Sequence, residues 1–312
     1  MNFVHRRGLS PLGAVVLGLL FSNLARTDQI FVTNSGNGTI GEYTTSGAPV
    51  NPALISGLNG ASGIAVSGSD LFVANFSSGT IGEYTTSGAT VNPALISGLG
   101  GPYGIAVSGS DLFVANFSAG TIGEYTTSGA PINPALISGL HGPSDIVVSG
   151  TNLFVVNNSF AIIGEYTTSG IPVSPSLITI PGAPFGIALS GSNLFISNVG
   201  TNTAGDFTTS GGIVNPTLIS GLDVPHGIAV DGSDLFVVNV ANGAIGEYTT
   251  SGATVNASLI SGLHDPFFLT IAAPTVAPVP EPSSFILLGL GLSALGFGFG
   301  VRKIIQRHNR VS

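Results

Sequence analysis

Cysteine and tryptophan are absent from this 312-residue chain, and Lys and Arg together number only seven. Without cysteine the protein has no disulfide bond, zinc–thiolate site or thiol nucleophile. All basic residues lie near the ends of the chain, at Arg6, Arg7, Arg26, Arg302, Lys303, Arg307 and Arg310, whereas all fifteen acidic residues lie between Asp28 and Glu281. Because nucleic-acid binding depends on neutralising phosphates, this acidic body excludes nucleic acid as a partner. It also disfavours anionic lipid surfaces.

The first 25 residues have the composition of a secretory signal peptide. Arg6 and Arg7 form a positive segment, and residues 12–21 form an apolar segment too short to span a bilayer. Small and polar residues follow as far as Ala25. We therefore expect residues 1–25 to direct export, with the cleavage point left open. A buried first helix is the alternative.

The last 39 residues form a different set of segments. Residues 274–284 are rich in proline, which is excluded from helices and central strands, and they predict a linker. Residues 285–301 are uncharged and just long enough for a transmembrane helix. Residues 302–312 are basic, and basic segments stay on the cytoplasmic side of a membrane. We expect an anchor that holds an exported body outside the inner membrane.

The tripeptide Pro280, Glu281 and Pro282 precedes this apolar segment, and the basic cluster follows it. In this order the three parts resemble the PEP-CTERM sorting signal, which is sometimes labelled an ice-binding protein C-terminal domain. The resemblance implies a Gram-negative bacterium, an exosortase that removes the tail, and release of the body to the cell envelope or extracellular matrix. Because many bearers of the signal come from makers of extracellular polysaccharide, this polymer is the expected partner. A permanent membrane anchor is the alternative.

Between these ends one unit is repeated. The tripeptide Gly-Glu-Tyr begins at Gly41 and recurs every 41 residues, with Gly-Asp-Phe at Gly205 as a variant. Each unit has the pattern of four short strands, for example residues 63–68, 70–75, 80–86 and 94–99, separated by Gly, Ser, Asn and Pro. We expect no helix in the body, because no segment has the apolar period of one. Four strands in about 40 residues is the size of a propeller blade.

The phase of the repeat predicts how the ring closes. The body starts at a second strand, residues 30–34, and ends with a lone first strand, residues 267–273. The last strand can therefore complete the first blade, and closure removes exposed sheet edges. We predict an all-β fold, a six-bladed β-propeller over residues 28–273.

Each unit also resembles the NHL-type propeller repeat, as in residues 102–125. The customary Asp is replaced at Asn34, Asn75, Asn116, Asn157, Asn198 and Asn239, and the basic residue after the next turn is missing. The resemblance supports the fold but not the RNA-binding role of some NHL propellers. We expect the Asn residues to hold turns. We expect the acidic column to face water, at Glu42, Glu83, Glu124, Glu165, Asp206 and Glu247.

Function on a propeller is concentrated in loops near the centre of the ring. The position before each predicted first strand varies most between units, at Ser62, Tyr103, Ser144, Phe185, His226 and Phe267. With neighbouring loop residues it predicts a binding face of Tyr103, His141, Asp145, Phe185, Asp223, His226, His264 and Asp265.

Four residues of this face, Asp223, His226, His264 and Asp265, are expected on adjacent blades. Two His and two carboxylates suit a divalent metal such as zinc or manganese. They follow no fixed ligand spacing, and loop His and Asp residues more often have ordinary turn and surface roles. We therefore predict no cofactor, with a divalent metal at these residues as the alternative.

Two enzyme families provide an alternative function. Gluconolactonase-like propellers hold a metal in a six-bladed ring, and virginiamycin B lyase-like propellers use similar units in seven blades; the chain matches neither set of functional residues. The body has no nucleophile elbow, phosphate loop or zincin motif. Residues 69–99 and 110–140 differ at only three places, which is typical of a scaffold or multivalent binder. We expect an exported binding or structural protein, with a metal-dependent lactonase or lyase as the alternative.

Overall fold

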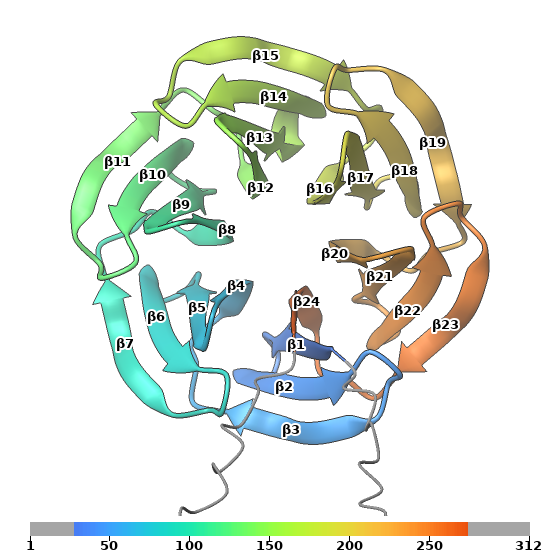
Figure 1. Cartoon of the computed structure of the whole chain (residues 1–312), viewed down its shortest axis with the longest axis horizontal. Coiled ribbons are helices and arrows are strands. Elements are labelled where there is room, and N and C mark those ends of the chain that lie inside the picture. Colours follow the sequence, from blue (N-terminus) through green and yellow to red (C-terminus); the bar gives the residue numbers. More distant parts are fainter. Residues whose placement is uncertain (1–27, 274–312) are drawn as a thin grey trace, which may run out of the picture.

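The computed structural model describes residues 28–273, which form a ring of six four-stranded antiparallel blades (Figure 1). The predicted six-bladed propeller is therefore confirmed. The predicted signal peptide, Pro-rich linker, membrane helix and basic tail lie outside the described residues. Within residues 28–273, no helix has the length and apolar character needed to cross a membrane.

We number the blades 1 to 6 from the N-terminus, and each has four strands from the centre of the ring outwards. The innermost strands are β24 (Pro266–Ala272), β4 (Ala61–Ser67), β8 (Pro102–Ser108), β12 (Pro143–Ser149), β16 (Pro184–Ser190) and β20 (Pro225–Asp231). The second strands are β1 (Gln29–Asn34), β5 (Asp70–Asn75), β9 (Asp111–Asn116), β13 (Asn152–Asn157), β17 (Asn193–Asn198) and β21 (Asp234–Asn239). The third strands are β2 (Thr39–Thr44), β6 (Thr80–Thr85), β10 (Thr121–Thr126), β14 (Ile162–Thr167), β18 (Thr203–Thr208) and β22 (Ala244–Thr249). The outer strands are β3 (Pro49–Ile55), β7 (Thr90–Ile96), β11 (Pro131–Ile137), β15 (Pro172–Thr179), β19 (Ile213–Ser220) and β23 (Thr254–Ile260).

Blade 1 contains both ends of the described chain, as the sequence predicts. Strand β24 pairs with β1, from Gln29 opposite Ala272 to Val32 opposite Leu269. This pairing closes the ring and leaves β24 at its centre (Figure 1). Without β24 the inner edge of β1 would be unpaired, so this pairing also covers an edge that could associate with another chain.

The hydrophobic core lies between neighbouring blades. Each second strand contributes one Phe that is at most 2% exposed: Phe31, Phe72, Phe113, Phe154, Phe195 and Phe236. In one cluster Phe72 and Ala74 of blade 2 pack against Leu112, Val114 and Tyr125 of blade 3. The repeated pattern of the sequence is thus a repeated interface, and each blade buries its apolar faces against its neighbours.

The innermost strands approach one another very closely near the centre. A Cβ atom on Gly104 would lie 2.6 Å from the Cα of Asp145, and one on Gly227 would lie 2.7 Å from the Cα of Phe268. Glycine therefore occupies the third position of these strands because the neighbouring backbone leaves no room for a side chain.

Three details differ from the sequence-based expectations. The fourth strand, expected at residues 94–99, is β7 (Thr90–Ile96), because its outer edge tolerates Pro93. The body was expected to have no helix, yet η1 (Asn158–Phe160) is a short 3-10 helix in blade 4. The acidic column faces water only in part: Glu42 and Asp206 are buried and the other four are half-buried, because each lies opposite a core Phe of the second strand.

Candidate functional site

Two loops of every blade meet on one face of the ring, which we call the mouth face. The residue after each second strand donates its backbone N–H to the loop before the innermost strand, for example Phe76 to Gly60 at 2.8 Å and Phe117 to Gly101 at 2.8 Å. The same bond recurs around the ring, including Ser35 to Asp265 at 3.1 Å. This backbone hydrogen bond is common to the six blades, so the loops of the mouth face are held in the same place in each blade.

Four rings from different blades gather at the centre of this face. They belong to Tyr103, Phe185, His226 and Phe267, each the second residue of its innermost strand. Tyr103 stacks on Phe267 with ring centroids 5.3 Å apart, and Phe185 stacks on His226 at 4.0 Å. Phe267 meets Phe185 at 5.5 Å and His226 at 4.6 Å, edge to face. We call these four residues the central cluster; the sequence analysis predicted three of them as site residues.

The other two blades have serine at the equivalent position, and these serines join blades. Ser62 Oγ donates to the carbonyl of Pro102 at 2.8 Å, and Ser144 Oγ donates to the carbonyl of Phe185 at 2.7 Å. Both side chains are at most 2% exposed. Their role is therefore to hold neighbouring blades together beneath the central cluster.

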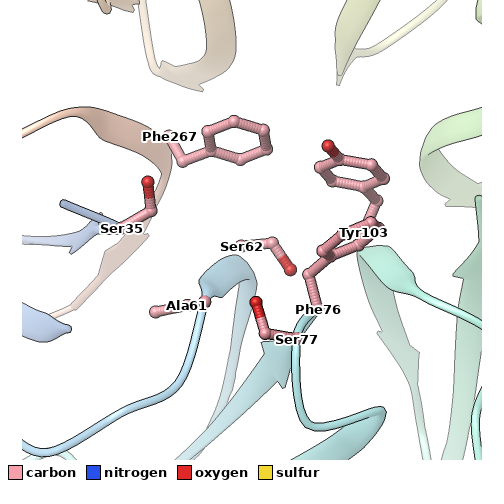
Figure 2. A pocket seen from close by; sticks show the side chains of 8 residues that line it. Ser35, Ala61, Ser62, Phe76, Ser77, Tyr103 and Phe267 are labelled. Atoms are coloured by element: carbon pink, nitrogen blue, oxygen red, sulfur yellow. The ribbon is translucent and has the colours of Figure 1, made fainter.

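A pocket of about 240 Å³ opens beside the central cluster (Figure 2). It is lined by Ser35, Gly60, Ala61, Ser62, Phe76, Ser77, Tyr103 and Phe267, from blades 1, 2 and 3. Phe76 contacts Tyr103 with ring centroids 4.8 Å apart. The lining contains no charged side chain, and the side chain of Ser77 is exposed. The pocket therefore combines aromatic faces with hydroxyl groups and is electrically neutral.

His226 is the only imidazole in the central cluster. Desolvation by burial among the rings lowers its pKa to about 4. Its Nδ1 atom is buried and has no hydrogen-bond partner among the described residues. Ser197 Oγ donates to its backbone carbonyl, which fixes β20 against blade 5. At neutral pH the imidazole is therefore uncharged.

Asp145 is buried in the wall between blades 4 and 5. Desolvation by burial raises its pKa to about 7, against the opposing effect of hydrogen bonds from Ile187 and Ile146. These two backbone N–H groups donate to separate carboxyl oxygens, each at 2.9 Å. The innermost strands of four other blades have glycine at this position. Asp145 therefore joins two blades through backbone contacts rather than facing the pocket.

The remaining predicted residues lie on loops of the mouth face. His141 is exposed and packs against Phe160, with ring centroids 3.8 Å apart. Asp223 donates its backbone N–H to Asn239 Oδ1 at 3.0 Å, and the carbonyls of His264 and Asp265 accept from Gly36 and Ser35. Within residues 28–273, no three His, Asp or Glu side chains are grouped so that they could hold a metal ion. The imidazole of His226 instead packs on Phe185 and Phe267.

Sequence reasoning missed the side chains that the second-strand loops place on this face. These are Phe76, Ser77, Phe117 and Phe160. The position after each second strand also varies between units, at Ser35, Phe76, Phe117, Asn158, Val199 and Val240. A comparison of the copies at this second position would have found two of the four missing residues, Phe76 and Phe117.

Residues 23–277 match the virginiamycin B lyase family. The chain belongs to this family. Residues 278–303 match the PEP-CTERM protein-sorting motif, which confirms the predicted motif at Pro280, Glu281 and Pro282. This motif indicates export and membrane-anchored processing by an exosortase-type enzyme. No curated protein matches the sequence.

Several solved structures share the fold of this virginiamycin B lyase family member. A chain of the nidogen/laminin complex is 17% identical, with a TM-score of 0.66 over 78% of this chain and 98% of that chain. A streptogramin B lyase is 20% identical, with a TM-score of 0.56 over 79% and 88%. Virginiamycin B lyase from Staphylococcus aureus is 20% identical, with a TM-score of 0.56 over 82% and 87%. At these identities the likeness extends to the fold alone.

Proposed function

We propose that this virginiamycin B lyase family member is a non-enzymatic binding protein of the cell surface or extracellular matrix. Its ligand is a neutral sugar unit of an extracellular polysaccharide, held in the pocket of the mouth face. The observation that carries the proposal is the uncharged lining of that pocket, in which Phe76, Tyr103 and Phe267 lie beside serine hydroxyls.

This lining matches the two sides of a sugar ring. A hexose presents C–H groups on its faces and hydroxyl groups around its edge. Aromatic rings provide large apolar contacts at a small cost in conformational entropy. Hydroxyl groups such as that of Ser77 fix the orientation of a bound ring through hydrogen bonds. A neutral pocket also avoids the unpaired buried charge that would penalise binding of an uncharged ligand.

The size of the pocket favours one unit of a longer ligand. Sites for whole small molecules occupy roughly 300–1,000 Å³. The pocket measures about 240 Å³ and is open to solvent at the mouth face. A polymer chain can therefore place one unit in the pocket while its neighbours remain outside.

Family membership supports a second function, a lyase or lactonase that acts near the centre of the ring. One related structure is a catalytically inactive histidine variant of the Staphylococcus aureus virginiamycin B lyase with quinupristin. In the present protein both carboxyl oxygens of Asp145 accept backbone hydrogen bonds, and desolvation keeps His226 uncharged. Both observations favour structural roles for Asp145 and His226, the two groups whose pKa values are most strongly shifted.

The two functions differ in what happens to a ligand. Mass spectrometry of quinupristin after incubation with the full-length protein is expected to show unchanged compound. Metal analysis of the purified protein is the companion measurement. Turnover that disappears in His226→Ala, or a bound metal that this variant loses, would establish the enzyme instead.

A matched pair of serines tests the binding pocket. Ser77 and Ser118 occupy equivalent positions in blades 2 and 3, but only Ser77 lines the pocket. We expect Ser77→Ala to weaken binding of a neutral β-glucan oligosaccharide about fivefold, the effect of losing one hydrogen bond. Ser118→Ala is expected to leave the affinity unchanged. Equal effects of the two substitutions, measured by calorimetry, would place the ligand elsewhere.

A further inference from the structure

Blade 4 differs from the other blades in the loop that follows its second strand. The loop forms the 3-10 helix η1 (Asn158–Phe160) and ends at Ala161, with φ of 56°. Blades 1, 2, 3 and 6 have glycine at the position of Ala161. A left-handed backbone disfavours a residue with a Cβ atom, so this loop departs from the repeat at an energetic cost. Departures of this kind cluster at sites of function.

The altered loop presents an aromatic side chain to solvent. Phe160 is 56% exposed, and it is the only aromatic residue among the large exposed hydrophobic residues of the described chain. The imidazole of His141 packs against it in a tilted arrangement, with ring centroids 3.8 Å apart and an interplanar angle of 35°. Blade 3 has Ala119 at the position equivalent to Phe160. The repeat frame therefore does not need this ring for folding.

One further ring, Phe117, lies between the pocket and the loops that carry this exposed pair. Phe117 contacts Tyr103, with ring centroids 4.7 Å apart. On its other side, a Cβ atom on Gly142 would lie 3.1 Å from the ring of Phe117 and 2.8 Å from Ser159 Oγ. Gly142 follows His141, and Ser159 precedes Phe160. The ring of Phe117 thus lies between Tyr103 of the pocket and the blade 4 loops that carry His141 and Phe160.

We infer that His141 and Phe160 form a second sugar-binding subsite, so that the mouth face binds an extended stretch of a neutral polysaccharide. The inference rests on the function proposed above and adds that the ligand is an internal chain segment. One sugar unit occupies the pocket, and a unit farther along the same chain stacks on Phe160. Because both contacts belong to one ligand, the second contact forms at a high effective concentration and increases the affinity of long chains.

The test is a length series of β-1,4-linked glucose oligomers, from the disaccharide to the hexasaccharide. All ring substituents of these sugars are equatorial, so both faces present C–H groups for stacking. In calorimetric titrations of the full-length protein we expect affinity to rise with length. The substitution Phe160→Ala is expected to weaken hexasaccharide binding about fivefold, the value of one aromatic contact, and to leave disaccharide binding unchanged. His141→Ala should reduce the same length dependence.

A matched control is Ile171→Ala in the same blade. Ile171 is 61% exposed, similar to Phe160, but it lies next to the outer strand β15. This variant is expected to keep the full length dependence. If Phe160→Ala also keeps it, the second subsite is wrong while the pocket stands. If the unmodified protein binds no oligomer of any length, the function proposed for the pocket is wrong as well.

Discussion

At the scale of single residues, His226 shows how the central cluster affects stability. Its ring lies against Phe185 and Phe267, and desolvation lowers its pKa to about 4. In the unfolded chain an imidazole has a pKa of about 6.5. As pH falls below this value the unfolded chain takes up a proton before the folded protein does. His226 therefore lowers stability between about pH 6.5 and pH 4.

Replacing His226 with phenylalanine should remove this acid sensitivity. Phenylalanine occupies the equivalent position in blades 5 and 1, as Phe185 and Phe267. We compare the free energy of unfolding of His226→Phe with that of the parent protein at pH 5 and at pH 8. The difference in favour of the variant should be about 1–2 kcal/mol larger at pH 5. Urea unfolding at both pH values measures the difference. A difference that does not change with pH would contradict the burial of a neutral imidazole.

Asp145 should have the opposite pH dependence. Its pKa is raised to about 7 by desolvation, whereas an unfolded Asp has a pKa of about 3.9. As pH falls, the folded protein therefore takes up a proton before the unfolded chain does. The free energy of unfolding rises as pH falls through 7, and this gain is lost when pH rises through 7 again. Relative to Asp145→Asn, the parent protein should gain on the order of 2 kcal/mol between pH 8 and pH 5. The free energies of unfolding are measured in urea at each pH. If they change with pH by the same amount in the two proteins, the carboxyl group is not desolvated.

At the scale of elements, a buried hydroxyl group supports the closing strand in addition to its backbone pairing with β1. Phe268 of β24 donates its N–H to Thr33 Oγ1 at 2.9 Å, and the same hydroxyl donates to the carbonyl of Ser62 at 2.7 Å. Thr33 is fully buried in β1. One side chain thus links the two strands that close the ring and joins blade 1 to blade 2.

The substitution Thr33→Val tests this link without changing side-chain shape. Valine occupies the equivalent positions Val156 and Val238 in blades 4 and 6. We expect a loss of about 1–3 kcal/mol in unfolding free energy, because a buried N–H and a carbonyl lose their partner. The exposed control Thr90→Val in β7 should change stability by less than about 0.5 kcal/mol. Thermal unfolding that fails to distinguish the two variants would argue against a role for Thr33 in closure.

The elements also show where sequence patterns succeed and fail. Second and third strands were predicted closely, because their apolar and polar residues alternate between Gly-rich turns. The outer strands were displaced along the sequence, since Pro93 and its equivalents argue against a strand except at a sheet edge. The partial burial of the acidic column was also missed, because packing between elements leaves no local signal in the sequence.

At the scale of the whole molecule, the repeat period and phase were sufficient to predict a closed six-bladed ring. They also pointed to the central cluster, because Tyr103, Phe185 and His226 lie where the units differ. The partners of these residues in the pocket were not predicted. Phe76 and Ser77 come from a second loop, and their position beside Tyr103 depends on how neighbouring blades pack. Metal coordination by His226 and His264 remains a prediction from the sequence. The ring of His226 packs on Phe185 and Phe267, whereas His264 lies in a loop, where its backbone carbonyl accepts from Gly36.

Residues that are the same in every blade and residues that differ between blades have different roles in the ring. Near-identical residues build the frame of the blades, and a few exceptions near the centre provide the pocket and the central cluster. The PEP-CTERM motif indicates export, so this face is presented to ligands outside the cytoplasm. The central claim is that the pocket binds a neutral sugar unit without altering it.

The most direct test is a calorimetric titration of the β-1,4-glucan hexasaccharide into the full-length protein and its Tyr103→Ser variant. Serine occupies the equivalent position in blades 2 and 4, at Ser62 and Ser144, so the blade frame accommodates it. The loss of the stacking ring should weaken binding about tenfold, and the ligand should be recovered unchanged. Equal affinity of the two proteins, or a chemically altered ligand, would contradict the account.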